Sequence, residues 1–264
     1  MAQAQTTSTE FGSNTVILVS FLTLYYFVER CLRVVALSCT PRFYNRMRAL
    51  QKDRIFFGIL MGVSSHNFVI SYTQMFLGLL ITALSTPLCV YATVKEWNSS
   101  VDPGKSWSLE PQTRTCITFR SILWVSELNR LDMYSLYILH HTGSILSLVS
   151  WLHFRWPNLL FLILFSTLAS EIPGDLVFLV STYKETLDEP IPKLERFRTQ
   201  LMRVNTLQYT VLRGAGILTV TWLMWSNAPG VSDRSMAEQV YAYSLLALYS
   251  VFCISYVLRQ LRKC

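Results

Sequence analysis

Residues 157–180 read PNLLFLILFSTLASEIPGDLVFLV, an apolar run interrupted once, by Glu171-Ile-Pro-Gly-Asp175. Its length suits an α-helix that crosses the hydrocarbon core of a bilayer, which takes roughly 20 residues. Proline and glycine together should kink this helix. Because a charge at membrane depth is costly, the two carboxylates are expected to face a cavity or a partner. The run therefore predicts a membrane span that carries an interior polar site.

The composition of the whole chain is that of a membrane protein. Of its 264 residues, 52% are hydrophobic and 15% are charged, whereas soluble domains average roughly 25% charged residues. Residues 1–13 form a polar tail, residues 14–258 read as a single transmembrane helical domain, and residues 259–264 form a basic tail. No interval looks long enough for a soluble domain, so the membrane part is expected to carry the function.

The apolar segments predict an all-α, polytopic transmembrane helix bundle of about seven or eight spans. As one helix, residues 55–94 would reach about 60 Å, so we expect two spans with a turn near Ser71–Gln74, or one span and a re-entrant piece. Residues 117–152 are either one tilted helix or two shorter spans, and residues 184–206 read as a loop with an amphipathic segment. Single spans are predicted at residues 14–37, 157–180, 207–226 and 237–258.

The net charge of +7 gathers in two clusters, residues 42–54 and 259–263. Both adjoin apolar spans, a pattern that the positive-inside rule explains without a nucleic-acid partner. If both clusters are cytosolic, an even number of spans separates them, which favours seven spans with the N-terminus outside the cytosol. This topology would leave the Asn98-Ser-Ser sequon in the cytosol and unused. The six cysteines show no metal spacing, and no disulfide framework is expected.

Two adjacent histidines, His140 and His141, lie within an apolar segment. Neutral imidazole accepts or donates a proton near pH 7, so the pair suits acid–base catalysis or substrate binding. Adjacent residues of a helix point about 100° apart, so the two rings do not easily share a metal ion, and no metal site is predicted. A structural role, with the imidazoles bonded to backbone or serine, is the alternative.

Glu171 and Asp175 are spaced i, i+4 and share one face of a helix. Like-charge repulsion and desolvation would let one of them keep its proton, and a protonated carboxyl in an apolar cavity is a proton donor. The alternative is a structural ion pair of one carboxylate with Arg213 or Arg120.

Further polar residues are expected to face the same interior. Asp132 is an additional candidate catalytic group, and Glu127 and Arg130 are candidates for substrate binding, although their i, i+3 spacing also suits an ion pair at a helix end. His66 and Asn67 form a polar patch in the second apolar block and are candidates for substrate binding as well.

The order of these residues resembles the TLC domain, the membrane domain shared by ceramide synthases and several small lipid-related proteins. Ceramide synthases carry an acid, an arginine, a basic residue and an aspartate, then paired histidines, then a span with further acids. The resemblance covers about residues 50–260 and implies a polytopic helical protein of the endoplasmic reticulum or a related membrane. The matching positions are Arg54, Ser64-Ser-His66, Arg130, Asp132, His140, His141 and Glu171.

Three functions are compatible with these residues. The first is acid–base catalysis on a hydrophobic isoprenoid or similar lipid from the bilayer, namely proton-initiated terpenoid cyclisation without a cofactor. It requires a protonated carboxyl, aromatic walls that stabilise carbocations, and a terminal base. The second, implied by the resemblance, is acyl transfer with acyl-CoA as co-substrate, the histidine pair as general base and the basic loop at residues 42–54 as phosphate site. The third is non-enzymatic lipid binding or trafficking.

Overall fold

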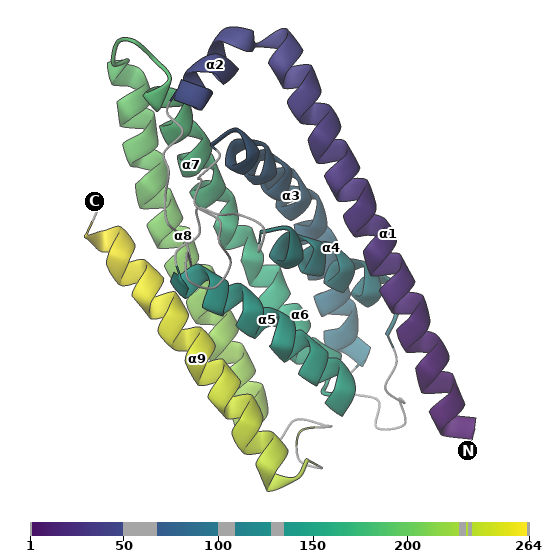
Figure 1. Ribbon diagram of the computed structural model, residues 1–264. Coiled ribbons are helices and arrows are strands. Elements are labelled where there is room, and N and C mark those ends of the chain that lie inside the picture. The colour runs from purple at the N-terminus through teal and green to yellow at the C-terminus, as the bar shows by residue number, and fades with distance from the viewer. Residues whose placement is uncertain are drawn as a thin grey trace.

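The computed structural model describes residues 2–49, 68–99, 109–127, 135–226, 231 and 234–262, and the elements it forms there are all helical (Figure 1). The all-α class is thus confirmed for this part of the chain. The elements are α1 (Ala2–Cys39), α2 (Pro41–Ala49), α3 (Phe68–Ser99), α4 (Pro111–Glu127), α5 (Ser135–Phe154), α6 (Asn158–Ser166), the 3₁₀ turn η1 (Thr167–Glu171), α7 (Ile172–Glu185), α8 (Pro192–Trp225) and α9 (Met236–Leu261).

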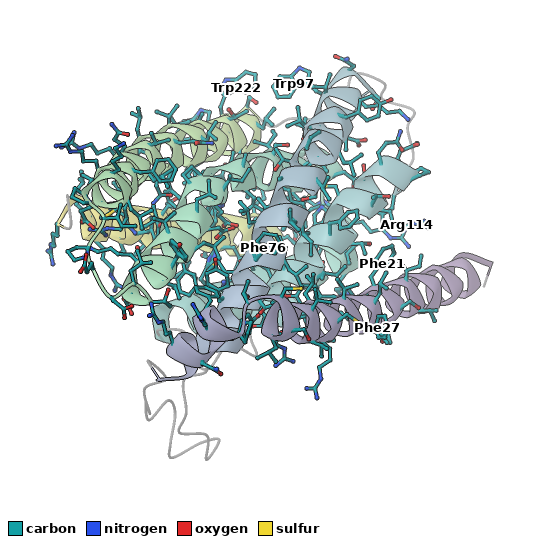
Figure 2. All side chains as sticks on the ribbon, turned by 90° about the horizontal axis from the view of Figure 1, so that it is seen from above. Phe21, Phe27, Phe76, Trp97, Arg114 and Trp222 are labelled. Atoms are coloured by element: carbon teal, nitrogen blue, oxygen red, sulfur yellow. A yellow bond between two sulfur atoms is a disulfide. The ribbon has the colours of Figure 1, made fainter. Side chains whose placement is uncertain are left out.

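Three helical segments among the described residues are long and apolar enough to cross a membrane. They are Tyr72–Ser99, Asn158–Glu185 and Met236–Leu261. Large apolar side chains also cover the outside of the bundle, which suits contact with lipid rather than water. Figure 2 shows four examples on three helices, each between 40% and 65% exposed: Phe27, Phe76, Trp97 and Trp222. These features support an integral membrane protein.

Two predicted boundaries are wrong. α3 runs unbroken from Phe68 to Ser99, so there is no turn at residues 71–74. The polar residue Thr73 is instead accommodated inside the bundle, where its hydroxyl lies 3.3 Å from the Tyr44 hydroxyl. The loop expected over residues 184–206 is confined to residues 186–191, because α8 already begins at Pro192, and proline is well tolerated in the first turn of a helix.

Two other segments, residues 117–152 and the segment around Glu171, agree with structures that the sequence allowed. Residues 117–152 contribute two separate helices, α4 and α5. The irregularity predicted around Glu171 takes the form of η1, a tighter 3₁₀ turn that joins α6 to α7 without a break. Pro173 then falls in the first turn of α7, where its missing N–H removes no helical hydrogen bond. Ser170 and Glu171 thus lie on an irregular turn in the middle of the bundle.

One end of the bundle, called the basic end below, combines α2, the start of α3, the end of α7 and the start of α8. The Phe43 ring packs against Tyr72 and Tyr183, with 5.4 Å and 5.8 Å between ring centroids. Arg46 donates a hydrogen bond to the Thr186 carbonyl at 2.8 Å. Hydrogen bonds from Arg198 and Lys184 lower the pKa of the partly exposed Glu195, at the start of α8, to about 2.

The other end, called the α3–α4 end, combines the end of α3 with the start of α4, the end of α5 and the start of α9. Lys95 forms an ion pair with Glu110 at 3.6 Å. Arg234, just before α9, donates a hydrogen bond to the Arg155 carbonyl at 2.5 Å. Long helices therefore connect two chemically different ends.

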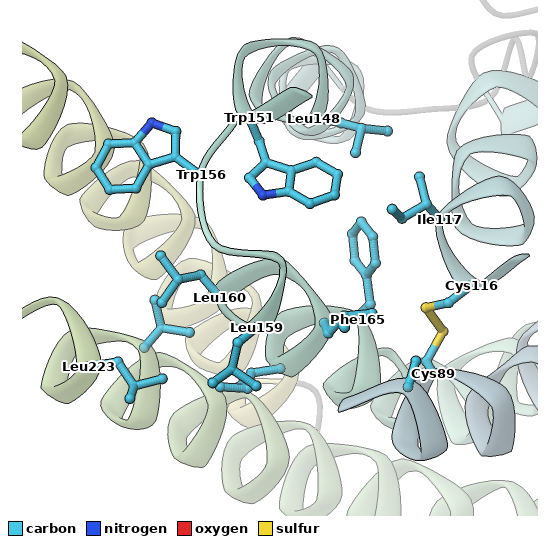
Figure 3. Packing of buried hydrophobic residues seen from close by; sticks show 14 of the residues in the cluster. Cys89, Cys116, Ile117, Leu148, Trp151, Trp156, Leu159, Leu160, Phe165 and Leu223 are labelled. Carbon is cyan, nitrogen blue, oxygen red and sulfur yellow. A yellow bond between two sulfur atoms is a disulfide. The ribbon is translucent and has the colours of Figure 1, made fainter. Parts of the chain in front are cut away.

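The main hydrophobic core lies among α3, α4, α5, α6 and α8 (Figure 3). Trp151, at the centre of this core, is only 1% exposed. On one side of this core, Cys89 of α3 and Cys116 of α4 form a disulfide, contrary to the expectation of no disulfide framework. Their spacing in the sequence carries no signal, because the two thiols meet only when α3 and α4 pack antiparallel.

α8 passes η1 so closely that a side chain at position 216 would clash with Thr167. A Cβ atom at Gly216 would lie 2.5 Å from Cγ2 of Thr167. Gly216→Ala is therefore expected to lower the free energy of unfolding by about 1–3 kcal/mol, the usual cost of overpacking. The measurement is thermal unfolding of the protein in lipid nanodiscs.

Gly214, on the same helix, is the matched control, because a Cβ atom there would meet nothing within 4 Å. Gly214→Ala should be neutral or stabilise by up to about 1 kcal/mol through helix propensity. Thr167→Ser removes the clashing methyl group and should restore the stability of Gly216→Ala. Equal effects of the two glycine substitutions would contradict the close contact.

Candidate functional site

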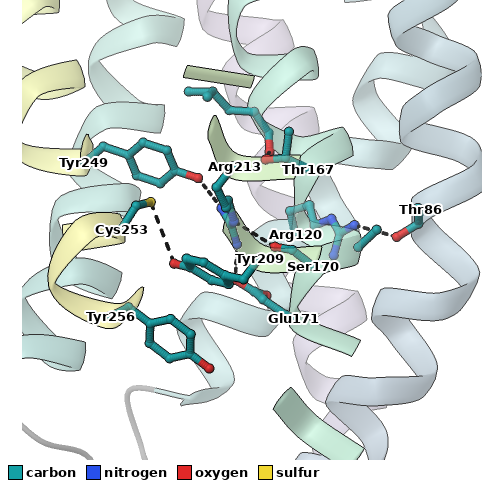
Figure 4. Close-up of polar contacts among 12 residues, drawn as sticks. Thr86, Arg120, Thr167, Ser170, Glu171, Tyr209, Arg213, Tyr249, Cys253 and Tyr256 are labelled. Carbon is teal, nitrogen blue, oxygen red and sulfur yellow. Dashed lines mark hydrogen bonds and ion pairs between the residues drawn. The ribbon is translucent and has the colours of Figure 1, made fainter. Parts of the chain in front are cut away.

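Arg213 of α8 lies in the middle of the bundle and is 3% exposed. Its Nε donates a hydrogen bond to Ser170 Oγ at 3.0 Å, and its Nη2 donates one to Glu171 Oε1 at 2.5 Å (Figure 4). Its Nη1 donates to the hydroxyl of Tyr249 on α9. Because a guanidinium withdrawn from water is costly unless it is paired, these contacts explain how the cation is accommodated.

The Arg213–Glu171 ion pair is one of the two alternatives that the sequence left open. η1 supplies both Ser170 and Glu171, so the irregular turn places two acceptors in front of one guanidinium. In this arrangement Glu171 accepts a hydrogen bond from Arg213 and orients its guanidinium.

A second arginine lies in the same polar centre. Arg120 of α4 is 0% exposed and donates a hydrogen bond to Thr86 Oγ1 at 3.0 Å. The charges of Glu171, Arg213 and Asp175 all act on it. Two buried arginines and two partly exposed acids therefore lie close enough to interact in the middle of the bundle.

A cavity of about 350 Å³ lies among α5, α6, α8 and α9, within the range of roughly 300–1,000 Å³ typical of small-molecule sites. Arg213 and His140 bring a guanidinium and an imidazole to its wall, and α5 adds small residues from Gly143 to Ser150. The rest is largely apolar and rich in aromatic rings. The aromatic lining residues are Trp124, Trp151, Trp156, Phe161, Phe165, Tyr241, Tyr249 and Phe252.

The cavity reaches the outer surface of the bundle beside α9. Leu248 and Val251 line it and are nevertheless 68% and 61% exposed. On the neighbouring outer face of α5, Leu146 and Val149 are also more than half exposed. Because these surroundings are apolar, the mouth is suited to a hydrophobic molecule that arrives from the lipid.

The two predicted histidines do not share one environment. His140 lines the cavity and stacks on Phe252, with 3.8 Å between ring centroids and an interplanar angle of 2°. Its ring lies 6.1 Å from that of Tyr249. His141 is 5% exposed and does not line the cavity. The structure thus brings His140, rather than His141, next to the Arg213–Tyr249 pair.

The other predicted residues are only partly placed. Asp175 lies on α7, one turn after Glu171, and does not line the cavity. Asp132, Arg130, His66 and Asn67 fall outside the described residues, and of Glu127, the last residue of α4, the side chain is not described. Within the ranges that the structure describes, no group of three or more His, Cys, Asp and Glu side chains could hold a metal ion.

Tyr249 and Ser170 were missed by reasoning from the sequence. A tyrosine or a serine within an apolar segment is common, so neither residue stands out. The available signal was Arg213, a cation within an otherwise apolar stretch, because a buried cation requires acceptors from neighbouring helices.

Comparison of the chain with family models, curated proteins and solved structures gives no match. The TLC resemblance therefore remains a prediction, and the function is argued from the geometry of the site.

Proposed function

We propose that the protein is a membrane-embedded enzyme that takes a hydrophobic isoprenoid or similar lipid from the bilayer and cyclises it by acid–base catalysis. The observation that carries this proposal is the aromatic cavity, which has a guanidinium-bound tyrosine hydroxyl and an imidazole in its wall. We further propose that α1, α3, α4, α5, α6 with α7, α8 and α9 form seven spans in the endoplasmic reticulum or a related membrane.

The shape of the cavity suits a long apolar molecule with one polar end. Its lining on α5 extends from His140 to Trp151, about 16 Å along the helix at 1.5 Å per residue. The polar groups Arg213 and Tyr249 lie level with His140, and the tryptophans lie toward the α3–α4 end. An apolar chain would therefore lie along the aromatic walls, with its oxygen function at Tyr249.

We assign to Tyr249 the role of the acid in this reaction. Its oxygen accepts a hydrogen bond from Arg213, and its own O–H, which lies beside the Cys253 thiol, would turn to donate to a substrate oxygen. When the proton moves to an epoxide oxygen, the C–O bond breaks, a carbocation forms, and the nearby guanidinium stabilises the phenolate that remains. In this scheme Glu171 acts by positioning Arg213.

The cavity also supplies the later steps. Aromatic faces stabilise a carbocation through their quadrupoles, and rings from four helices line this cavity. His140 takes the proton that is released when the last double bond forms. It then returns that proton to Tyr249, so the overall reaction is an isomerisation that consumes no cofactor.

Acyl transfer receives no comparable support. Acyl-CoA is water-soluble and would approach from the basic end, where the arginines of α2 could bind its phosphates. The cavity extends from Arg213 in the opposite direction, toward Trp156 and Tyr241. Lipid binding without chemistry uses the same cavity and is separated from catalysis by experiment.

Filling the cavity tests whether it binds the lipid. Gly143 lines the cavity, and a Cβ atom there meets nothing within 4 Å. Gly143→Leu should therefore occupy the space without a clash and abolish photo-crosslinking to a photoreactive prenyl lipid in microsomes. Gly214→Leu, in open space away from the cavity, should leave the crosslink intact. Crosslinking that survives in Gly143→Leu would place the lipid elsewhere.

Turnover tests the chemistry. With a prenylated epoxide, the wild type should give an isomer of unchanged mass. Tyr249→Phe should slow this turnover by about 10²–10⁴-fold, the usual contribution of general acid catalysis, and retain the crosslink. A crosslink without an isomer in the wild type would reject cyclisation in favour of binding. An acylated product from labelled acyl-CoA and a sphingoid base would establish the transferase instead.

A further inference from the structure

We infer that the basic end of the bundle faces the cytosol and that the α3–α4 end, with its disulfide, faces an oxidising compartment across the membrane. The inference does not depend on the proposed reaction. It combines the direction of the helices, the distribution of charge and the position of the Cys89–Cys116 bond.

The direction of α9 shows at which end of the bundle the C-terminal basic cluster lies. α8 and α9 are antiparallel, because Asn205 Nδ2 donates to Tyr256 Oη at 3.1 Å while Arg213, two turns further along α8, bonds to Tyr249. The end of α9 therefore lies beside the first half of α8, on the same side as α2. The described parts of the two basic clusters, Arg42 with Arg46 and Arg259 with Arg262, thus lie toward the same end of the structure.

The charges at the two ends differ. The described acids at the basic end are Glu185, Asp188, Glu189 and Glu195, and its cations are Arg42, Arg46, Lys184, Lys193, Arg196, Arg198, Arg259 and Arg262. The described charges at the α3–α4 end are nearly balanced: Lys95, Arg114, Arg155 and Arg234 against Glu96, Glu110 and Glu238. Because cytosolic segments carry the excess of lysine and arginine, the basic end is the cytosolic one.

The disulfide gives the same orientation by an independent criterion. Cys89 precedes the end of α3 by ten residues, and Cys116 follows the start of α4 by five, so both lie within about 15 Å of the α3–α4 end along their helices. Disulfides form and persist in oxidising compartments and are rare in the cytosol. The bond therefore indicates that this end lies away from the cytosol.

The orientation revises the predicted side of the Asn98 sequon. α3 is one continuous helix that begins beside α2 and ends at Ser99, so a single crossing separates Asn98 from the basic loop. The two spans expected in residues 55–94 had placed Asn98 in the cytosol. The exposed Asn98 side chain instead lies on the same side as the disulfide.

A pair of single-thiol variants tests the orientation. Cys39 is exposed where α1 meets α2; the first variant keeps it and the disulfide and carries Cys31→Ser, Cys253→Ser and Cys264→Ser. The second variant adds Cys39→Ser and Asn98→Cys. In sealed microsomes with the cytosolic face outward, a membrane-impermeant maleimide should label the first variant directly. It should label the second only after the membrane is permeabilised.

The reverse pattern, with direct labelling of the second variant only, would overturn the inference. The disulfide is checked on a variant that carries all four serine substitutions and keeps Asn98. Two thiols should react in the denatured protein after reduction, and none before it. Reaction of both thiols without reductant would remove the second argument and contradict the oxidising location of this end.

Discussion

Glu171→Gln is expected to lower the free energy of unfolding by about 3–5 kcal/mol, the cost of leaving a buried charge without its counter-ion. Glutamine keeps the size of the side chain and an acceptor oxygen for Arg213 Nη2, but removes the negative charge. The Arg213 side chain is only 3% exposed, so the remaining cation has little access to water. The change is measured by equilibrium unfolding in mixed lipid–detergent micelles.

Removal of Arg213 should lower the free energy of unfolding by less than removal of the Glu171 charge does. The Glu171 side chain is 34% exposed, so leaving it unpaired in Arg213→Met is expected to cost about 1–3 kcal/mol, the range for an unsatisfied polar group. The double variant Glu171→Gln, Arg213→Met leaves no buried charge from this pair and should be more stable than Glu171→Gln alone. If the double variant instead lost the sum of the two single effects, the two residues would not be coupled.

Removal of the Cys89–Cys116 disulfide is expected to have the second large effect. The two cysteines are 27 residues apart in the sequence, and the chain-entropy model gives about 3–4 kcal/mol for closing a loop of this length. The double variant Cys89→Ser, Cys116→Ser should therefore unfold at a lower temperature than the wild type in nanodiscs.

Reductant provides the internal control. It should destabilise the wild type by about as much as the double substitution does, and should leave the double variant unchanged. Cys31→Ser, which removes an exposed free thiol of α1, should behave like the wild type with and without reductant. An unchanged unfolding temperature of the wild type in reductant would contradict a stabilising disulfide.

The features that follow from local pattern were predictable from the sequence. Apolar runs of sufficient length predicted helices, and three of them meet the length and composition of membrane spans. The angle between successive residues of a helix predicted that His140 and His141 would diverge. The ion pair between Glu171 and Arg213 was one of the two alternatives that the sequence left open for the carboxylates of this segment.

Features that arise from tertiary packing were not predictable. The Cys89–Cys116 bond depends on the register between α3 and α4, which no spacing encodes. Thr73, within the unbroken α3, contacts the Tyr44 hydroxyl of α2, and a partner so far away in the sequence is not indicated by local pattern. The cavity depends on the gap among four helices, so Tyr249 could not be distinguished from the other tyrosines of the chain.

The lateral mouth beside α9 has a consequence for how the protein would experience the concentration of its ligand. Leu248 and Val251 border this mouth and are exposed on the apolar outer surface. A ligand that enters by this mouth comes from the plane of the membrane, where it is dissolved among the lipids. Occupancy would then follow the mole fraction of the ligand among the membrane lipids, so extra inert lipid would dilute the ligand even when its total amount in the sample is unchanged.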